Sequence, residues 1–555
     1  MKHLRNPCCF KKLSAQIPAA SLANANENLN ALNQLTAESN EIAEELNQIA
    51  QQLMSPGLDK ANYKNIQVFP TADENFKFIT SILGKSIGLI TGKYDILAGK
   101  AQAGVAYIES ITNQELVSHQ ILAPLLKGKA DENTTFDTIL TLIQAKFIAV
   151  PNIKTTNRLE QVVEDLLTGN TALFINGIHT ALIIDSRKIE KRSIEKPDNE
   201  GTVLSSLEAF IEDIEINCSM IIKRLPIPNL RFELFSVGVL SKTKVKLVWI
   251  EGIANAGIVA EARRRIQKID IDTVDGIGVL AELIEDTPLS IFPKYHQTQR
   301  PDLAAKALTN GQFAVLCNNS PFAFLAPIAF WDNFKSMDDY AELTITACYL
   351  RLGRIIAYAV SVIISPLYLA FVTYNQIIVP QSLAVAIATG REGVPFPSGV
   401  ELLLMTFGMT IIREAALRIP GSVGYFIGTL AAVVIGQAAV SAGYVSASII
   451  IVVAISEISS FAVVTTTITY TSRLLNYSFI ILAGFLGMFG LISGIVIVFW
   501  HLASLESFGV PYLYPFVPFD LEGMKDTFIR MRLSVLKKRL RILAPFNRVR
   551  MGNDK

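Results

Sequence analysis

The chain has 555 residues, of which 50% are hydrophobic and 18% are charged, and its mean hydropathy is +0.37. A net charge of +1 gives no bias toward nucleic acid, so no nucleic-acid partner is expected. Five scattered cysteines lack the spacing of a disulfide framework or metal site. No phosphate-binding loop, nucleophile elbow or H-E-x-x-H motif occurs, so we expect no enzyme, catalytic residue, metal or cofactor.

Residues 1–70 are expected to form an N-terminal arm. Residues 21–55 are rich in Asn, Gln, Glu and Ala, and Leu29, Leu32, Leu35 and Leu46 follow much of the spacing of an amphipathic helix. That pattern favours a helix or a short coiled coil, whereas the low-complexity composition equally favours a mobile arm.

Two soluble α/β subdomains are predicted next, at 71–195 and 196–345. In the first, GVAYIES, KFIAV and TALFINGIHTALIID read as strands, the last with an Asn-Gly turn at Asn176 and Gly177. In the second, helical patterns such as ANAGIVAEARRRIQKI alternate with strand patterns such as KVKLVWIEGI. A charged stretch with Pro and Gly, 186–201, is expected to connect the two.

A membrane domain is predicted at 346–515. The segments 355–374, 423–442, 446–471 and 477–501 are each long and apolar enough to cross about 30 Å of hydrocarbon. Within 380–420 the apolar run LLLMTFGMTII is short, which favours a re-entrant or interfacial element. The predicted fold class is therefore multi-domain: a soluble mixed α/β N-terminal half followed by an all-α polytopic membrane domain.

The basic residues give an orientation. Arg351 and Arg354 precede the first predicted span, and the tail 516–555 is strongly basic. By the positive-inside rule, four spans are expected to leave both termini of a multi-pass membrane protein in the cytoplasm. The tail either lies on the anionic inner leaflet of the lipid bilayer or forms a solvated basic segment.

Polar residues inside the predicted spans are the candidate site. Glu457 is either part of an ion path or a structural partner for a neighbouring helix. Gln437 interrupts the second span among small neighbours, which permit close helix packing or a narrow pore. The pore or ion-path candidates are Gln437, Gly436, Val440, Ser441 and Glu457.

Several stretches together resemble the A subunit of the GerA family of spore-germinant receptors. They include YHQTQRPDLAAKAL, R-E-G-V-P-F-P and I-G-Q-A-A-V-x-A-G, in this order after a long soluble region. The second of these marks Arg391, Glu392, Pro395 and Pro397 as a membrane-domain motif. Where the family usually has Asp-Gly before S/T-P-F, this chain has Asn318 and Asn319.

The resemblance implies a subunit of a nutrient receptor in the inner membrane of a bacterial spore. It implies a transporter-like B subunit and a lipoprotein C subunit as partners, and a homo-oligomer whose membrane domains gate ions at the start of spore germination. Two alternatives are a non-conducting scaffold for the receptor complex and a secondary transporter subunit. The transporter would need inverted repeats, and none is visible in the sequence.

Overall fold

A computed structural model describes residues 66–84, 87–128, 139–140, 142–148, 150, 152–188, 204–419, 434–543, 547, 549 and 550. The predicted N-terminal arm up to residue 65 lies outside the described residues. So do most of the predicted connection 186–201 and residues 423–433 of the second predicted span.

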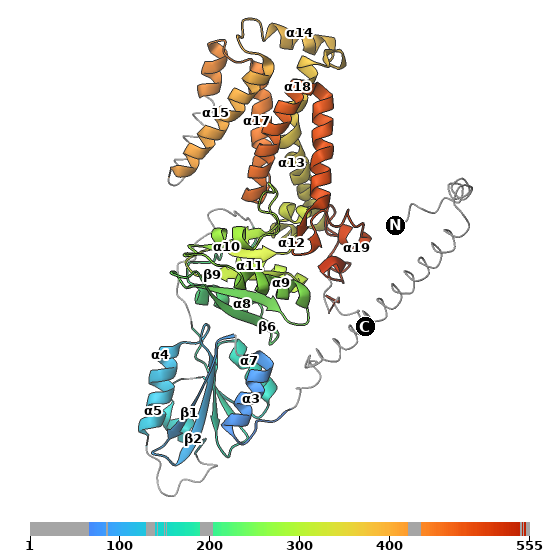
Figure 1. Ribbon diagram of the computed structural model, residues 1–555. Coiled ribbons are helices and arrows are strands. Elements are labelled where there is room, and N and C mark those ends of the chain that lie inside the picture. The colour runs from blue at the N-terminus through green and yellow to red at the C-terminus, as the bar shows by residue number, and fades with distance from the viewer. Residues whose placement is uncertain are drawn as a thin grey trace, which may run out of the picture. The chain divides into compact units, whose positions relative to one another are not determined.

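The first α/β region, residues 67–188, is built on a five-stranded antiparallel sheet with strand order β1-β2-β4-β5-β3. Alternating apolar side chains such as Ala103 and Val105 on β2 face a core that also holds Val117 and Leu125. Helices α3 and α7 lie on one side of the sheet and α4 and α5 on the other (Figure 1). The elements are α3 (Ala72–Leu83), β1 (Leu89–Ile96), β2 (Ala101–Ile108), α4 (Gln114–Leu116), η2 (Val117–Leu122), α5 (Ala123–Lys127), η3 (Ile143–Phe147), β3 (Ile153–Thr156), α7 (Leu159–Leu167), β4 (Thr171–Ile175) and β5 (Ala181–Ile184).

One strand predicted in this region is wrong. The run KFIAV, residues 146–150, does not form a strand, because η3 is helical through Phe147. Ile139 and Ile143 are both buried against the core, and their spacing of four residues places them on one face of a helix.

The second α/β region, residues 204–326, has a five-stranded antiparallel sheet of order β6-β7-β9-β10-β8. Numbered from its own first strand, this is the order of the first sheet, so the two regions are called the first repeat and the second repeat. Its elements are α8 (Ile214–Arg224), β6 (Leu230–Val237), β7 (Thr243–Ile250), α9 (Ala256–Gln267), α10 (Ile277–Ile284), β8 (His296–Thr298), α11 (Pro301–Asn310), β9 (Phe313–Cys317) and β10 (Ala323–Ala326).

An asparagine at the same position stabilises each repeat internally: Asn75 in the first repeat and Asn217, 142 residues later, in the second. The Asn75 Nδ2 donates to the carbonyl of Phe69 (2.8 Å), and its Oδ1 accepts from the Phe69 backbone N–H (2.9 Å). Asn217 makes the same pair of bonds with Ile211, at 2.6 and 2.8 Å. Because each buried carboxamide satisfies both backbone groups of one residue, it fixes the chain entering the helix.

A second pair of asparagines repeats with the same spacing. Asn176 follows β4 and accepts through Oδ1 from the N–H of Ala72, the first residue of α3 (2.9 Å). Asn318 follows β9 and accepts in the same way from Ile214, the first residue of α8 (3.4 Å). Each bond ties a strand end to a helix start, so the duplication reaches individual side chains.

The rest of the chain is mainly helical. After η4 (Phe330–Phe334) and α12 (Asp338–Ala341) come α13 (Thr344–Thr373), η5 (Gln376–Ile378), α14 (Gln381–Thr389), α15 (Ser398–Arg418), a helical segment at 434–441, α17 (Ala447–Phe461) and α18 (Thr466–Ser504). Among the described residues, two helices, α13 and α18, have the length and apolar composition needed to cross a membrane.

Helix α18 is two helices joined by a turn. Gly487 has non-helical backbone angles (φ 60°, ψ −139°), and a Cβ placed on Gly494 would lie 3.0 Å from the Phe479 ring. In a straight helix these residues would be about 22 Å apart, so the arms 466–486 and 488–504 fold back on each other. A Cβ on Gly487 would lie 2.8 Å from Tyr374, so the close approach there requires glycine.

These boundaries differ from the predicted spans. The segment 477–501 contains the turn at Gly487 and is therefore not one helix, and 446–471 contains the end of α17 at Phe461 and the start of α18 at Thr466. The short apolar run at 402–412 is the middle of α15, which has 21 residues and is about 31 Å long. Hydropathy alone predicted neither the turn at Gly487 nor the extension of α15 into charged residues at its ends.

The C-terminal segment returns to the second repeat. It contains β11 (Glu506–Ser507), β12 (Val510–Pro511), α19 (Leu521–Met524) and η6 (Arg541–Leu543). Phe508, Val510 and Leu543 belong to the hydrophobic core of the second repeat. Arg530 and Arg539 donate to the backbone carbonyls of Glu342 and Thr309. The described part of the predicted tail 516–555 is thus packed on the protein and is not a free solvated segment.

Candidate functional site

A buried ion-pair network joins the start of α13 to the returning C-terminal segment. Arg351 and Asp339 are both 0% exposed, and the Arg351 Nε lies 3.1 Å from the Asp339 Oδ2. The Arg351 Nη1 lies 3.0 Å from Asp526, while Arg354 pairs with Asp339 at 2.7 Å. These four side chains, which we call the junction network, connect the membrane-candidate helix α13 to α12 and to the C-terminal segment. The sequence indicated Arg351 and Arg354 only as flanking charges.

Asp526 is held ionised by this network. Burial alone would raise its pKa, but the positive charges of Lys335, Arg351 and Lys306 together hold the pKa below its ordinary value. The Tyr340 hydroxyl also donates to Asp526, at 2.8 Å. Removing Arg351 would take away the ion-pair partner of the Asp526 carboxylate.

Glu457 lies inside the helical bundle. Its carboxylate is 3.5 Å from Arg413 on α15 and 3.8 Å from Arg473 on α18. Glu457 is itself on α17, so one carboxylate links three helices. This is the partner arrangement expected of a structural role, the alternative to an ion path.

A layer of polar contacts accompanies Glu457 in the bundle. Ser456 donates to the carbonyl of Ser361 (2.7 Å), and Asn476 donates to the same carbonyl (2.6 Å) and to Ser456 (3.1 Å). These residues come from α13, α17 and α18. Interhelical hydrogen bonds of this kind fix the register of packed helices where water is absent.

The R-E-G-V-P-F-P motif forms the turn into α15. Arg391 donates to Ser398, and its Nη2 lies 3.9 Å from Glu401, which is fully buried and accepts from the backbone N–H of Ser446. The structure thus places Arg391 at the meeting point of the first turns of α15 and α17. The other predicted motif residues, Glu392, Pro395 and Pro397, are exposed, and Pro397 is the N-cap of α15.

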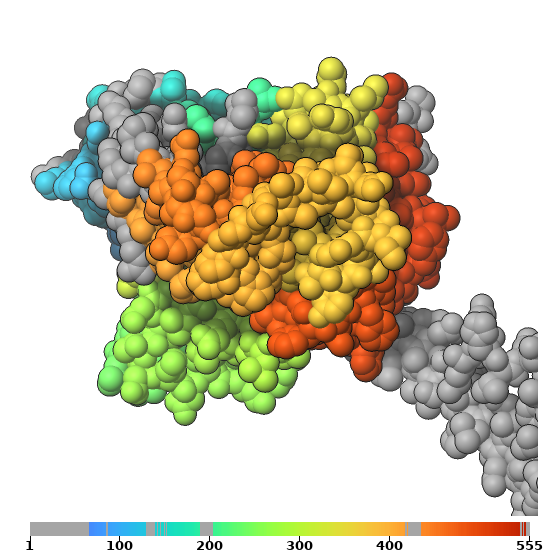
Figure 2. Space-filling view, turned by 90° about the horizontal axis from the view of Figure 1, so that it is seen from above, coloured from blue at the N-terminus to red at the C-terminus, as the bar shows by residue number. Residues whose placement is uncertain are grey.

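Gln437 and Glu457 differ in exposure, because Gln437 is exposed and Glu457 is buried. In the helical segment 434–441, Gln437 and Ser441 are exposed and Val440 is partly exposed, whereas Gly436 is buried against Ile450 of α17. Seen from above, α14 and α15 (gold) lie beside orange residues of the bundle on the face turned to the viewer (Figure 2). The predicted site residues therefore divide into an exposed set on 434–441 and a buried carboxylate on α17.

The chain is similar in sequence to known proteins. A family model described as Bacillus/Clostridium GerA spore germination protein matches residues 77–542. The spore germination protein KA of Bacillus subtilis (strain 168) is 35% identical over 450 residues, which cover 81% of this chain and 82% of that protein. An uncharacterized membrane protein, YfkQ, of the same organism is 32% identical over 464 residues, covering 83% and 89%. The crystal structure of the N-terminal domain of the A subunit of the Bacillus megaterium spore germinant receptor GerK3 is 25% identical, covers 48% of this chain and 98% of its own, and gives a TM-score of 0.37.

Proposed function

The chain belongs to the GerA family of spore germination proteins, and on this premise we propose that it is the A-type subunit of a nutrient germinant receptor in the spore inner membrane. The matched range contains the first repeat from the middle of α3 onward, the whole second repeat, the helical bundle and most of the returning C-terminal segment. The family's role in germination therefore applies to the chain as a whole and not to one domain of it.

Membrane embedding is supported by the surface of the bundle. Phe485, Phe489 and Trp500 are 79%, 74% and 76% exposed on the two arms of α18. Large apolar side chains in such numbers on one helical hairpin would be unfavourable in water and favourable in hydrocarbon. The bundle is accordingly assigned to the bilayer.

The contacts of the helix ends suggest six crossings. At the end far from the second repeat, Tyr374 after α13 donates to the carbonyl of Gly484 (2.8 Å), and Glu401 of α15 meets Ser446 before α17. At the other end, His501 of α18 lies 3.1 Å from Ser290 of the second repeat. The proposed crossings are α13, α15, the segment ending at 441, α17 and both arms of α18. An even number keeps both termini on one side, as four spans would.

The side of the membrane follows from the basic residues. Arg351 and Arg354 lie at the end of α13 that meets the second repeat, and the C-terminal segment folds onto the same end. The positive-inside rule then puts both repeats and the C-terminus in the cytoplasm.

Ion conduction is the finer part of the proposal. One observation carries it: Gln437 and Ser441 are polar and exposed on a helix that the proposed topology places in the bilayer. Exposed polar side chains are unfavourable against lipid, but they can line a water-filled path at the centre of an oligomer. The face of 434–441 is therefore assigned to a pore formed by several copies of the chain.

Ion flux tests this assignment. Proteoliposomes that contain the chain with its proposed transporter-like B and lipoprotein C partners would be compared with those carrying Gln437→Leu, and a germinant-dependent flux should fall in the variant. Ile435→Leu, at an exposed apolar position of the same segment, is the control and should leave flux unchanged. Unchanged flux in Gln437→Leu would exclude this face from the pore.

The second candidate function is a non-conducting scaffold that assembles the receptor. It is favoured by the same exposed face, since the small residues around Gln437 would also suit close packing against a partner helix. Native mass spectrometry separates the two. A closed homo-oligomer supports the channel, and a single copy bound to other subunits supports the scaffold.

A further inference from the structure

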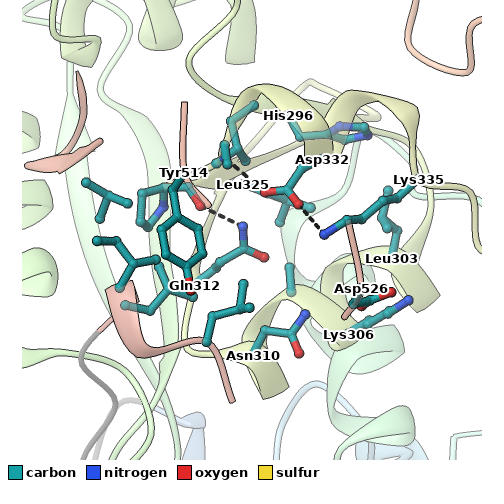
Figure 3. A pocket seen from close by; sticks show the side chains of 18 of the residues that line it. His296, Leu303, Lys306, Asn310, Gln312, Leu325, Asp332, Lys335, Tyr514 and Asp526 are labelled. Carbon is teal, nitrogen blue, oxygen red and sulfur yellow. Dashed lines mark hydrogen bonds and ion pairs between the residues drawn. The ribbon is translucent and has the colours of Figure 1, made fainter. Parts of the chain in front are cut away.

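A cavity lies where the second repeat, the start of the helical part and the C-terminal segment meet. Its volume is about 110 Å³, space for about three or four water molecules and too little for a drug-sized ligand. Figure 3 shows side chains of several elements around one space: Lys306 and Asn310 of α11, Asp332 of η4, Lys335 just after η4, and Asp526 of the C-terminal segment. The cavity suits a small polar ion.

The acidic groups that line the cavity already have partners. Asp332 pairs with Lys335 at 2.8 Å, and Glu522 pairs with Lys538 at 3.4 Å. Asp526 pairs with Arg351 in the junction network. The three carboxylates are therefore balanced by three cations and leave no negative charge for a further cation.

Other cations at the cavity have no carboxylate partner among the described residues. The Lys306 ammonium makes no hydrogen bond or ion pair with another described residue, and it lies over the ring of Tyr340. Arg550 lines the cavity and donates to the amide oxygen of Asn310, and the neighbouring Arg539, outside the lining, donates to the backbone carbonyls of Thr309, Asn547 and Val549. These neutral acceptors do not cancel the positive charges.

Burial and the excess positive charge both lower the pKa of Lys306. Burial lowers the pKa of Lys306, and although Asp526 opposes this, Lys335, Arg351 and Arg550 lower it further, so that the pKa lies well below its ordinary value. An anion in the cavity would reverse both effects, because it would supply a partner and neutralise the neighbouring repulsion.

We propose that this cavity binds a small oxyanion, of the phosphate or sulfate class, through Lys306, Arg550 and the surrounding polar groups. The bound ion would contact α11 of the second repeat and the C-terminal segment at once. Because the segment from Asp332 to Lys335 continues through α12 into α13, occupancy would stabilise the contact between the second repeat and the membrane bundle. The proposal does not depend on the channel assignment.

Thermal unfolding of the full-length protein in detergent tests it. Inorganic phosphate should raise the unfolding temperature above that in chloride at equal ionic strength. Lys306→Met should weaken the apparent phosphate affinity by about tenfold or more, the factor expected for one charge-assisted hydrogen bond. The control is Lys268→Met, an exposed lysine at the C-cap of α9 in the same repeat, which should behave as the wild type.

Arg550→Gln is the second variant, because Lys306→Met could alter folding. It should also lose the phosphate shift while keeping the unfolding temperature in chloride. A phosphate shift that is absent from the wild type, or equal in all four proteins, would overturn the proposal.

A further arm identifies the source of the oxyanion. Phosphatidic acid in mixed micelles presents a phosphate monoester on a lipid, and phosphatidylcholine serves as its control. A Lys306-dependent shift with phosphatidic acid that exceeds the shift with free phosphate indicates a lipid headgroup, and the reverse indicates a free ion. If the wild type shows no shift with either phosphatidic acid or free phosphate, oxyanion binding is contradicted for both sources.

Discussion

The first and second repeats share a framework but differ in what covers it. Strand order, both asparagine pairs and the turn positions are equivalent. Yet Lys154 and Glu164 of the first repeat are exposed, while the equivalent His296 is buried and Lys306 lines a cavity. The C-terminal segment and the entry to α13 pack on the second repeat at this side. A duplicated fold can thus be specialised by its attachments while its internal bonds remain.

Breaking the junction network should destabilise the protein far more than breaking an exposed ion pair of the first repeat. Arg351→Met removes an ion-pair partner from the buried carboxylates of Asp526 and of Asp339, which keeps Arg354, and should destabilise α13 and the C-terminal segment packed against it by about 3–5 kcal/mol. Hydrogen exchange of backbone amides in the detergent-solubilised protein measures the loss. Arg187→Met is the matched control in the first repeat, where the exposed pair with Asp185 contributes about 1 kcal/mol or less. Equal effects of both variants would contradict the comparison.

Acid should act more strongly on the second repeat. Burial lowers the pKa of His296 to about 4, although Asp332 opposes the shift. The unfolded chain, with an ordinary histidine pKa of about 6.5, takes up a proton that the folded chain does not. Stability is therefore lost as the pH falls from about 6.5 to 4, by about 3 kcal/mol in total for this group.

Comparison of the wild type with His296→Asn isolates this histidine from the carboxylates that titrate in the same range. Exchange protection of β8 to β10 should fall less steeply with acid in the variant. Protection of β3 to β5 in the first repeat, where Lys154 is exposed, should be the same in both proteins. A steep loss that persists in His296→Asn would assign the acid response to other groups.

The asparagine pairs should have matching effects. Asn75→Ala and Asn217→Ala each leave one backbone N–H and one carbonyl without their partner, partly buried at Phe69 and buried at Ile211, so each should cost about 2 kcal/mol. The loss of exchange protection should stay within the repeat that carries the substitution. If Asn75→Ala lowered protection in both repeats equally, they would unfold as one unit and not as two.

The smallest effects are expected at the turns after β4 and β9. Gly177 and Asn319 both have positive φ, 92° and 64°. Gly177→Ala should cost about 1 kcal/mol because a Cβ is strained there, whereas Asn319→Gly should change stability by less than about 0.5 kcal/mol, since asparagine tolerates this region. A larger effect of Asn319→Gly would show that its side chain contributes more than its backbone angles.

Sequence reasoning was strongest where a pattern is local. The strand alternation in KVKLVWIEGI predicted β7, and the Asn-Gly pair at 176 marked the turn after β4. The departure at Asn319 is explained in the same way, because the usual glycine and this asparagine share a positive φ. Each of these features depends on neighbouring residues alone.

The contacts that form the candidate site were not predictable from local patterns. Arg351 meets a carbonyl of Asp526 that is 175 residues away, and Glu457 meets arginines on two other helices. The duplication was also missed, although Asn75 and Asn176 recur as Asn217 and Asn318, and the burial patterns of β2 and β4 recur in β7 and β9. The turn at Gly487 lies inside a continuous apolar stretch, so hydropathy predicted one span there.

The returning C-terminal segment has a consequence for synthesis. Phe508, Val510 and Leu543 complete the core of the second repeat, yet a ribosome makes them only after every helix of the bundle. The first repeat has all its strands early and can fold while the chain is still growing. The second repeat has to wait with part of its core open until translation ends. A chain that stops short would therefore leave apolar surface exposed for chaperones or proteases to recognise, and only a finished chain would close it.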